Sequence, residues 1–186
     1  MVGVGAGGRV SVAARVCMVD ASGSILLDTF VRPLEPVTDL RTAVSGVREE
    51  HLSQAPALAQ VRPVVASLLQ NRLLVGHALR NDLEALGLSH PRKRTRDTTA
   101  YPPFLDGAKG RARPLKALAQ EELGLEIQTG EHSPVEDARA ALYLYLKHRR
   151  SWEAWVRGKA LPGGVVAPQK LLSWEELAKK DAMADL

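Results

Sequence analysis

Two short segments of the chain hold the residue types that are best suited to chemistry. In the first, Asp82 stands on an expected helix that directly follows an expected buried strand. In the second, His132 lies in the loop before another expected helix, and Asp137 lies in the first turns of that helix. A third acid, Asp97, closes a further expected strand. Carboxylates are the ligands that hard divalent cations prefer, and a histidine can take up a proton near neutral pH.

Each of these residues also has an ordinary explanation when it is taken alone. Asp82 is compatible with a solvated acid on a helix surface, and His132 with an unremarkable loop histidine. Asp137 would also favour the positive end of its own helix dipole. The single residues therefore favour a structural interpretation, and only their combination indicates a site.

Taken together, the segments resemble the DEDDh family of 3′→5′ exonucleases, in the branch of RNA exonuclease 4. The second motif of that family is a strand followed by Gly-His and then Asn-Asp, matched by Gly76-His77 and Asn81-Asp82. Its third motif is a His five residues before an Asp, matched by His132 and Asp137. Further stretches that resemble the branch are Met1 to Gly5, Val37 to Gly46, His90-Pro91 and Arg96-Asp97-Thr98, and the resemblance covers about residues 1–155.

This resemblance implies the chemistry and the roles of the site residues. In the family, two Mg²⁺ or Mn²⁺ ions about 4 Å apart hold the attacking and leaving oxygens of a phosphodiester. The resemblance implies that Asp137 binds the first metal directly, that Asp82 supports the second metal largely through water, and that His132 is the general base. Asp97 is expected to orient a loop. The residues that we expect at the substrate are Arg41, His77, Asn81, Arg113 and Lys116.

The first motif of the family is expected immediately before the position of Met1. That motif is Asp-x-Glu at the end of the first strand, and no Asp-x-Glu before Met-Val-Gly stands in this sequence. We therefore expect an N-terminally truncated exonuclease domain without most of its first strand. Two carboxylates are too few for a tight pair of metals, so the chain is expected to be impaired. The alternative is a catalytically inactive module that only binds nucleic acid.

The pattern of the chain predicts an α/β fold, in which an RNase H-like mixed sheet is flanked by helices. Residues 10–19 and 25–31 read as two strands of a hairpin. Apolar spacing predicts helices near residues 61–69, 79–88 and 115–123, and a short buried strand at 73–75. Ser133, Pro134 and Glu136 have the spacing of a helix start with a capping box. The domain is expected to cover residues 1–155, followed by a tail, 156–186, with one short helix.

The charge of the chain agrees with a polyanionic partner. The formal net charge is +4, and the basic residues gather in three clusters, near residues 92–96, 109–116 and 147–150. We interpret these clusters as phosphate contacts rather than as solvated faces. By resemblance, single-stranded RNA is preferred over DNA, with precursors of ribosomal RNA as the substrate class and the nucleus and nucleolus as the location.

Other classes of function fit the sequence poorly. No apolar run approaches the length of about 20 residues that spans a membrane. Gly3 to Gly8 satisfies the G-x-G-x-x-G spacing of dinucleotide sites, but that motif needs a strand before it and a helix after it. A β-type run follows here, so we expect a plain loop, with neither a nicotinamide nor a flavin cofactor. The protein is expected to be a monomer.

Overall fold

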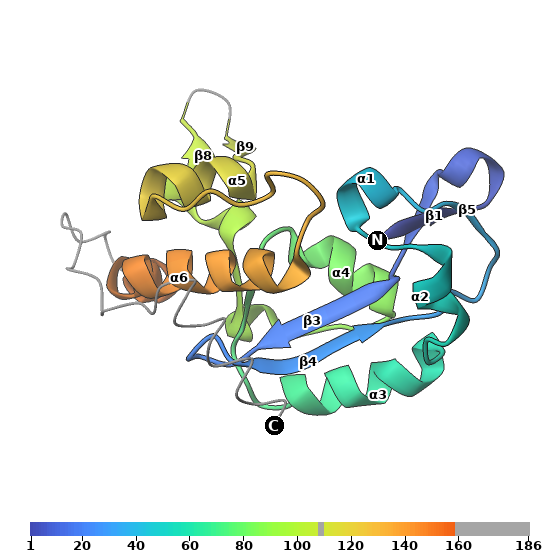
Figure 1. The fold of residues 1–186 in the computed structure, drawn as a ribbon. Coiled ribbons are helices and arrows are strands. Elements are labelled where there is room, and N and C mark those ends of the chain that lie inside the picture. Colours follow the sequence, from blue (N-terminus) through green and yellow to red (C-terminus); the bar gives the residue numbers. More distant parts are fainter. Residues whose placement is uncertain (108–109, 159–186) are drawn as a thin grey trace.

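A β-hairpin crosses the middle of the molecule (Figure 1). The computed structural model describes residues 1–107 and 110–158. Strands β3 (Arg15–Val19) and β4 (Ile25–Phe30) pair antiparallel. Asp20 closes the turn, because its backbone N–H donates to Ser24 and its carboxylate accepts from the N–H of Ser22. The predicted hairpin is thus confirmed.

A second, three-stranded sheet lies at the other end of this hairpin. Strand β1 (Val2–Val4) is its middle strand, with β2 (Val10–Val12) and β5 (Val37–Asp39) antiparallel on either side. The predicted strand over residues 10–19 is therefore split in two. The break falls at the buried residues Ala13 and Ala14, where the carbonyl of Ala14 accepts from Val31. The glycine-rich segment forms a short 3-10 turn, η1 (Ala6–Gly8), between two antiparallel strands.

The third pairing is parallel and carries acidic and imidazole side chains at one end. Strand β6 (Leu74–Gly76) runs beside β7 (Thr95–Asp97), and the crossover between them contains α4 (Leu79–Leu86) and a 3-10 turn, η2 (Arg92–Arg94). His77 follows β6 and Asp97 ends β7. Because the strands are parallel, both residues lie at the same edge.

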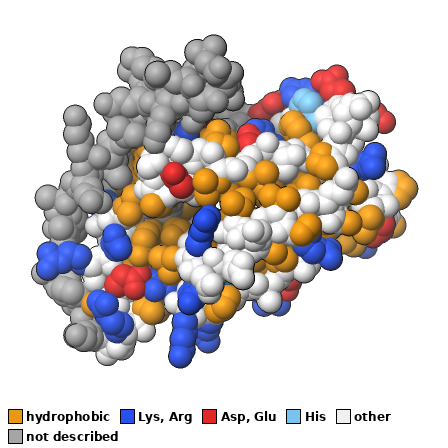
Figure 2. All heavy atoms as spheres, turned by 90° about the horizontal axis from the view of Figure 1, so that it is seen from below, with side chains coloured by type: hydrophobic (Ala, Val, Ile, Leu, Met, Phe, Trp, Pro, Cys, Tyr) orange, Lys and Arg blue, Asp and Glu red, His pale blue; other side chains and the backbone are white. Residues whose placement is uncertain are grey.

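Three helices lie between β5 and β6. They are α1 (Thr42–Ser45), α2 (Glu49–Ser53) and α3 (Leu58–Leu69). Of the predicted apolar face of α3, Val61, Val65 and Leu69 are buried against the hairpin, whereas Val64 is 47% exposed. Figure 2 looks onto the underside of the molecule, where hydrophobic side chains form a band between Lys and Arg side chains.

The remaining elements pack around one long helix. After β7 come the 3-10 turns η3 (Thr98–Ala100) and η4 (Pro102–Phe104), then the short pair β8 (Leu105–Asp106) and β9 (Arg111–Ala112). Helix α5 (Leu115–Leu118) continues into a π-helical turn, η5 (Ala119–Leu123), that ends at Gly124. The long helix is α6 (Pro134–Val156). Its core contact is aromatic, since Tyr101 stacks on Trp152 at 4.1 Å.

The architecture is thus a mixed α/β fold with antiparallel and parallel strand pairs. The pairs form four separate groups within the described residues, rather than one continuous sheet. No helix in the described part of the chain is long and apolar enough to cross a membrane. The predicted helix of the tail lies outside the described residues.

Candidate active site

Asp97 holds together the backbone of the segment that leads into α4. Its Oδ1 accepts from the N–H of Ala78 at 2.9 Å, and its Oδ2 accepts from the N–H of Leu79 at 2.8 Å. Oδ1 also accepts from the N–H and hydroxyl of Thr99. These bonds fix Ala78 in a left-handed conformation, with φ of 56°, that residues other than glycine rarely adopt. Asp97 therefore orients this loop, as the sequence indicated.

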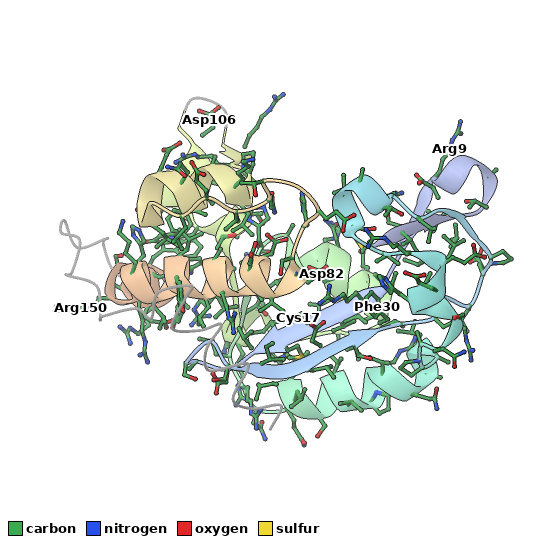
Figure 3. The ribbon with its side chains drawn as sticks, viewed as in Figure 1. Arg9, Cys17, Phe30, Asp82, Asp106 and Arg150 are labelled. Carbon is green, nitrogen blue, oxygen red and sulfur yellow. The ribbon has the colours of Figure 1, made fainter. Side chains whose placement is uncertain are left out.

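The loop places two of the predicted site residues. His77 is half-buried, and its Nδ1 lies 2.7 Å from the hydroxyl of Thr98. Asp82 lies on the exposed side of α4, one turn into the helix (Figure 3). Asn81 is the exposed neighbour of Asp82.

The start of α6 positions the other two predicted site residues, His132 and Asp137. Ser133 caps the helix, its hydroxyl accepting from the N–H of Glu136, and Pro134 takes the first helical position. The predicted helix start is confirmed. His132 precedes the cap and Asp137 lies in the first turn, so that Nδ1 of His132 is 3.8 Å from Oδ2 of Asp137. The five-residue spacing brings the imidazole and the carboxylate together because the chain bends at the cap.

Asp137 has a second partner that the sequence did not indicate. Gln128 donates from Nε2 to Oδ1 of Asp137 at 2.9 Å. Gln128 has a left-handed backbone, with φ of 55°, and its carbonyl accepts from Nζ of Lys116 at 3.1 Å. No motif marks a glutamine in an irregular loop, so only the folded structure reveals this contact.

Electrostatic interactions connect the two halves of the site. Burial lowers the pKa of His77, while Asp97 and Asp137 act to raise it. Burial raises the pKa of Asp137, against the effects of Gln128, His132 and His77. The charge on His77 is therefore coupled to carboxylates from both segments.

The carboxyl of Asp82 belongs to the same electrostatic environment. Although the residue is exposed overall, burial of its carboxyl raises the pKa, the amino group of Met1 lowers it, and Asp97 raises it. Figure 3 draws Asp82 between the start of α6 and the three-stranded sheet. Asp82 and His77 thus share Asp97 as a charged neighbour.

The carboxylates of Asp82 and Asp137 are the type of ligand that a hard cation prefers, but they are too few to hold one. Two carboxylates with raised pKa values are groups whose ionised form a divalent cation would favour. Within residues 1–107 and 110–158, however, no group of three or more His, Cys, Asp or Glu side chains is placed to hold a metal ion. Asp82 and Asp137 are therefore ligands of the right chemical type, but the described residues do not complete a metal site around them.

The other residues that we expect at the substrate form hydrogen bonds or ion pairs with nearby groups of the protein. The guanidinium of Arg41 donates to Ser11 Oγ at 2.9 Å and to the carbonyl of Gly8 at 2.8 Å. Arg113 forms an ion pair with Glu121. Lys116 is exposed beside Gln128.

The three basic clusters are not equivalent in the structure. Arg96 is only 4% exposed and forms a salt bridge with Glu153 at 2.8 Å, so this member of the first cluster is not free for phosphate. The other members, Arg92 to Arg94, lie at the beginning of β7, opposite to Asp97. Arg150 lies at the far end of α6 from the site (Figure 3). In the cluster near 109–116, Lys116 is linked to the site, because it donates to the carbonyl of Gln128, whose side chain donates to Asp137. Lys109 of this cluster lies outside the described residues.

Comparison with known proteins decides what kind of protein this site belongs to. The model of the exonuclease family RNase T matches residues 8–145. The chain belongs to this family. It is 47% identical to human RNA exonuclease 4 over 159 residues, and 49% identical to RNA exonuclease 4 of Cryptococcus neoformans over 153 residues. These matches cover 86% and 82% of this chain but 38% of each relative, so the chain spans about two fifths of their length.

Solved structures of exonuclease domains have the same fold. The Pan2 exonuclease module of Saccharomyces cerevisiae, in complex with AAGGAA RNA, superimposes with a TM-score of 0.68 at 30% identity, over 80% of this chain and 26% of that one. The Pan2 catalytic unit of Neurospora crassa gives a TM-score of 0.65 at 25% identity, over 78% of this chain and 25% of that one. The predicted RNase H-like fold of DEDDh exonucleases is therefore confirmed.

Proposed function

We propose that this chain is the nuclease domain of a 3′→5′ exonuclease that hydrolyses single-stranded RNA with Mg²⁺ or Mn²⁺. The observation that carries the proposal is the contact of 3.8 Å between Nδ1 of His132 and Oδ2 of Asp137. Family membership and the RNA named with the Pan2 structures support RNA as the substrate class. We further propose a monomer that acts on precursors of ribosomal RNA in the nucleus and nucleolus, by analogy with the branch.

The residues of the site have distinct tasks in this proposal. A metal pair would supply the nucleophilic water and offset the charge that develops on the phosphate. Asp137 and Asp82 provide its oxygen ligands from two separate elements. His132, whose Nδ1 lies 3.8 Å from Asp137, takes the proton from the attacking water. Lys116, Arg113 and the exposed Arg111 neutralise the phosphates of the bound strand.

We further propose that the number of acidic ligands limits the activity of this site, since the described residues supply no group of three that could hold a metal. Two carboxylates leave two close cations with too little shared negative charge, so we expect slow turnover without further acidic ligands. A form extended at the N-terminus with a segment that carries Asp-x-Glu should be faster. Equal rates in the two forms would show that Asp82 and Asp137 suffice.

The second candidate function is a module that binds nucleic acid without hydrolysing it. The lack of a three-ligand metal cluster among the described residues favours it. Metal dependence separates the two functions, because phosphate contacts by Lys and Arg do not require a divalent cation.

The deciding experiment uses single-stranded RNA labelled at its 5′ end. We expect progressive shortening in Mn²⁺, none in EDTA, and a loss of at least about a hundredfold in Asp137→Asn and Asp82→Asn, since metals contribute several kcal/mol to such reactions. Glu35→Gln, an exposed acid outside the site, is the matched control and should cleave as the parent does. RNA binding that is retained without any metal-dependent shortening would favour the binding module.

A further inference from the structure

The position of His132 depends on contacts outside its own helix. His132 lies before the N-cap Ser133, so the hydrogen bonds of α6 do not hold it. The loop that contains it begins after Gly124 and has no regular secondary structure up to α6. On one side, Gln128 ties this loop to Asp137. On the other side, the loop contacts residues 44–48, which run from the end of α1 to the start of α2 and are called the α1 segment below.

Two contacts fasten the loop to the α1 segment. The backbone N–H of His132 donates to the carbonyl of Val44 at 2.8 Å. The neighbouring Glu131 accepts from Nη2 of Arg48 at 2.7 Å, and Nη1 of Arg48 donates to the carbonyl of Gly46 at 3.2 Å. Arg48 thus binds its own turn and the histidine loop at the same time.

Gly46 makes this close approach possible. Its φ is 64°, a left-handed value that favours glycine. A side chain there would also bring its Cβ to 3.3 Å from Oε2 of Glu131 and 3.6 Å from Cβ of Glu131. The turn is therefore shaped so that the side chain of Glu131 can lie against it.

We propose that Arg48 and Glu131 are positioning residues that clasp the His132 loop onto the α1 segment and so hold the imidazole beside Asp137. The proposal rests on the proposed function, in which His132 is the general base. Neither residue is expected to touch RNA. Both side chains are nearly half exposed, at 47% and 45%, so the ion pair contributes little to overall stability. The ion pair should instead increase the fraction of molecules in which the His132 imidazole lies beside Asp137.

The test compares Arg48→Ala, Glu131→Gln and the double variant with the parent chain. Single-turnover rates on single-stranded RNA in Mn²⁺ should fall about fivefold in each single variant, which corresponds to about 1 kcal/mol at 1.36 kcal/mol per factor of ten. The RNA concentration at half-maximal rate should not change. The double variant should lose no more than either single variant, because the pair acts as one unit. Arg48→Lys, which keeps the charge, should recover part of the rate.

A second readout is independent of activity. Exchange of the His132 amide hydrogen, followed by NMR, should become faster in both single variants, because its bond to Val44 opens more often. Exchange of amides in α3 and the melting temperature should stay as in the parent. The control pair is Arg80 and Glu84, an exposed Arg–Glu pair on α4, whose alanine and glutamine variants should leave rate and exchange unchanged.

Unchanged exchange of the His132 amide in Arg48→Ala would overturn the clasp. Faster exchange without a lower rate would overturn its positioning role, and so would losses that add in the double variant. A parent chain without Mn²⁺-dependent turnover would count against the proposed function, whereas the exchange data would still decide whether the clasp exists.

Discussion

The side-chain amide of Gln128 donates a hydrogen bond of 2.9 Å to Oδ1 of Asp137. The same residue accepts a hydrogen bond from Lys116 through its carbonyl. Gln128 therefore lies between a basic side chain expected at the RNA backbone and a carboxylate expected at the metal. It orients the carboxylate without carrying charge itself, so its removal changes geometry and leaves the charge of the site as it is.

Replacement of Gln128 by leucine should weaken Mn²⁺ binding by roughly tenfold, the lower end of what the loss of an outer partner of a metal ligand costs. Leucine keeps the size of the side chain but removes the donor, so Asp137 is free to turn. Calorimetric titration with Mn²⁺ measures the affinity. Gln120→Leu, at an exposed position of η5, is the control. Equal affinities in Gln128→Leu and the parent would mean that the hydrogen bond has no part in metal binding.

Replacement of Asp97 by alanine should lower the free energy of unfolding by about 2 kcal/mol, because it leaves partly buried N–H donors without an acceptor. Asp97→Asn should be milder, since it retains one carbonyl oxygen for the N–H of Ala78. Urea unfolding at pH 7 measures both. A loss below about 0.5 kcal/mol in Asp97→Ala would show that water replaces the carboxylate at this turn.

Removal of the positive charges of Arg111, Arg113 and Lys116 should weaken binding to RNA of many sequences alike. The slope of log affinity against log salt should fall by about one unit for each phosphate contact that is lost. Arg111 should contribute more than Arg113, whose charge is partly neutralised by Glu121. Filter binding over a series of salt concentrations gives the slope.

Arg92 and Lys93 supply the matched control for this experiment. They are exposed and basic but lie at the end of β7 that is opposite to the site. Their double alanine variant should keep the slope of the parent. If the slope fell in the Arg92 and Lys93 variant and not in the Arg111, Arg113 and Lys116 variant, the bound RNA would follow a different face of the domain.

Replacement of Glu153 by glutamine should lower the free energy of unfolding by about 2 kcal/mol at pH 7, since Arg96 is buried and loses a charged partner. The hydrogen bond from Arg96 lowers the pKa of Glu153, against the effect of burial, and Tyr145 lowers it further. Because the folded pKa is lowered, this stabilisation is complete above the pKa of the unfolded chain. It is lost as the pH falls through the lower folded pKa.

The free energies of unfolding of Glu153→Gln and of the parent should therefore differ at pH 7, and the difference should become small near pH 3. Urea unfolding at both pH values measures this. Glu84→Gln removes the exposed partner of Arg80 and should stay within about 0.5 kcal/mol of the parent at either pH. A difference for Glu153→Gln that did not shrink in acid would mean that packing, and not charge, accounts for the loss.

The sequence predicted those parts of the fold that local patterns control. The hairpin, most of the apolar face of α3 and the capped start of α6 are local features, and the structure confirms them. The site residues came from motif spacing, which places His132 and Asp137 but gives no sign of Gln128, Arg48 or Glu131. Arg48 and Glu131 join segments that are far apart in the chain, and Gln128 reaches Asp137 only through the path of an irregular loop, so all of these contacts depend on tertiary packing. The role of Arg96 was misjudged for the same reason, because burial against Glu153 has no local signature.

Left-handed backbone at residues other than glycine links the site to the stability of the whole domain. Arg41, Ala78 and Gln128 adopt it and belong to the candidate site or adjoin it, whereas a fourth such residue, Asn71, contacts Arg94 instead. Each costs the folded state about 1 kcal/mol relative to a relaxed residue. Glycine would relieve this cost but would free the same turns to sample other conformations. The domain therefore trades thermal robustness for a preorganised site, and efforts to stabilise it are best directed away from these three turns.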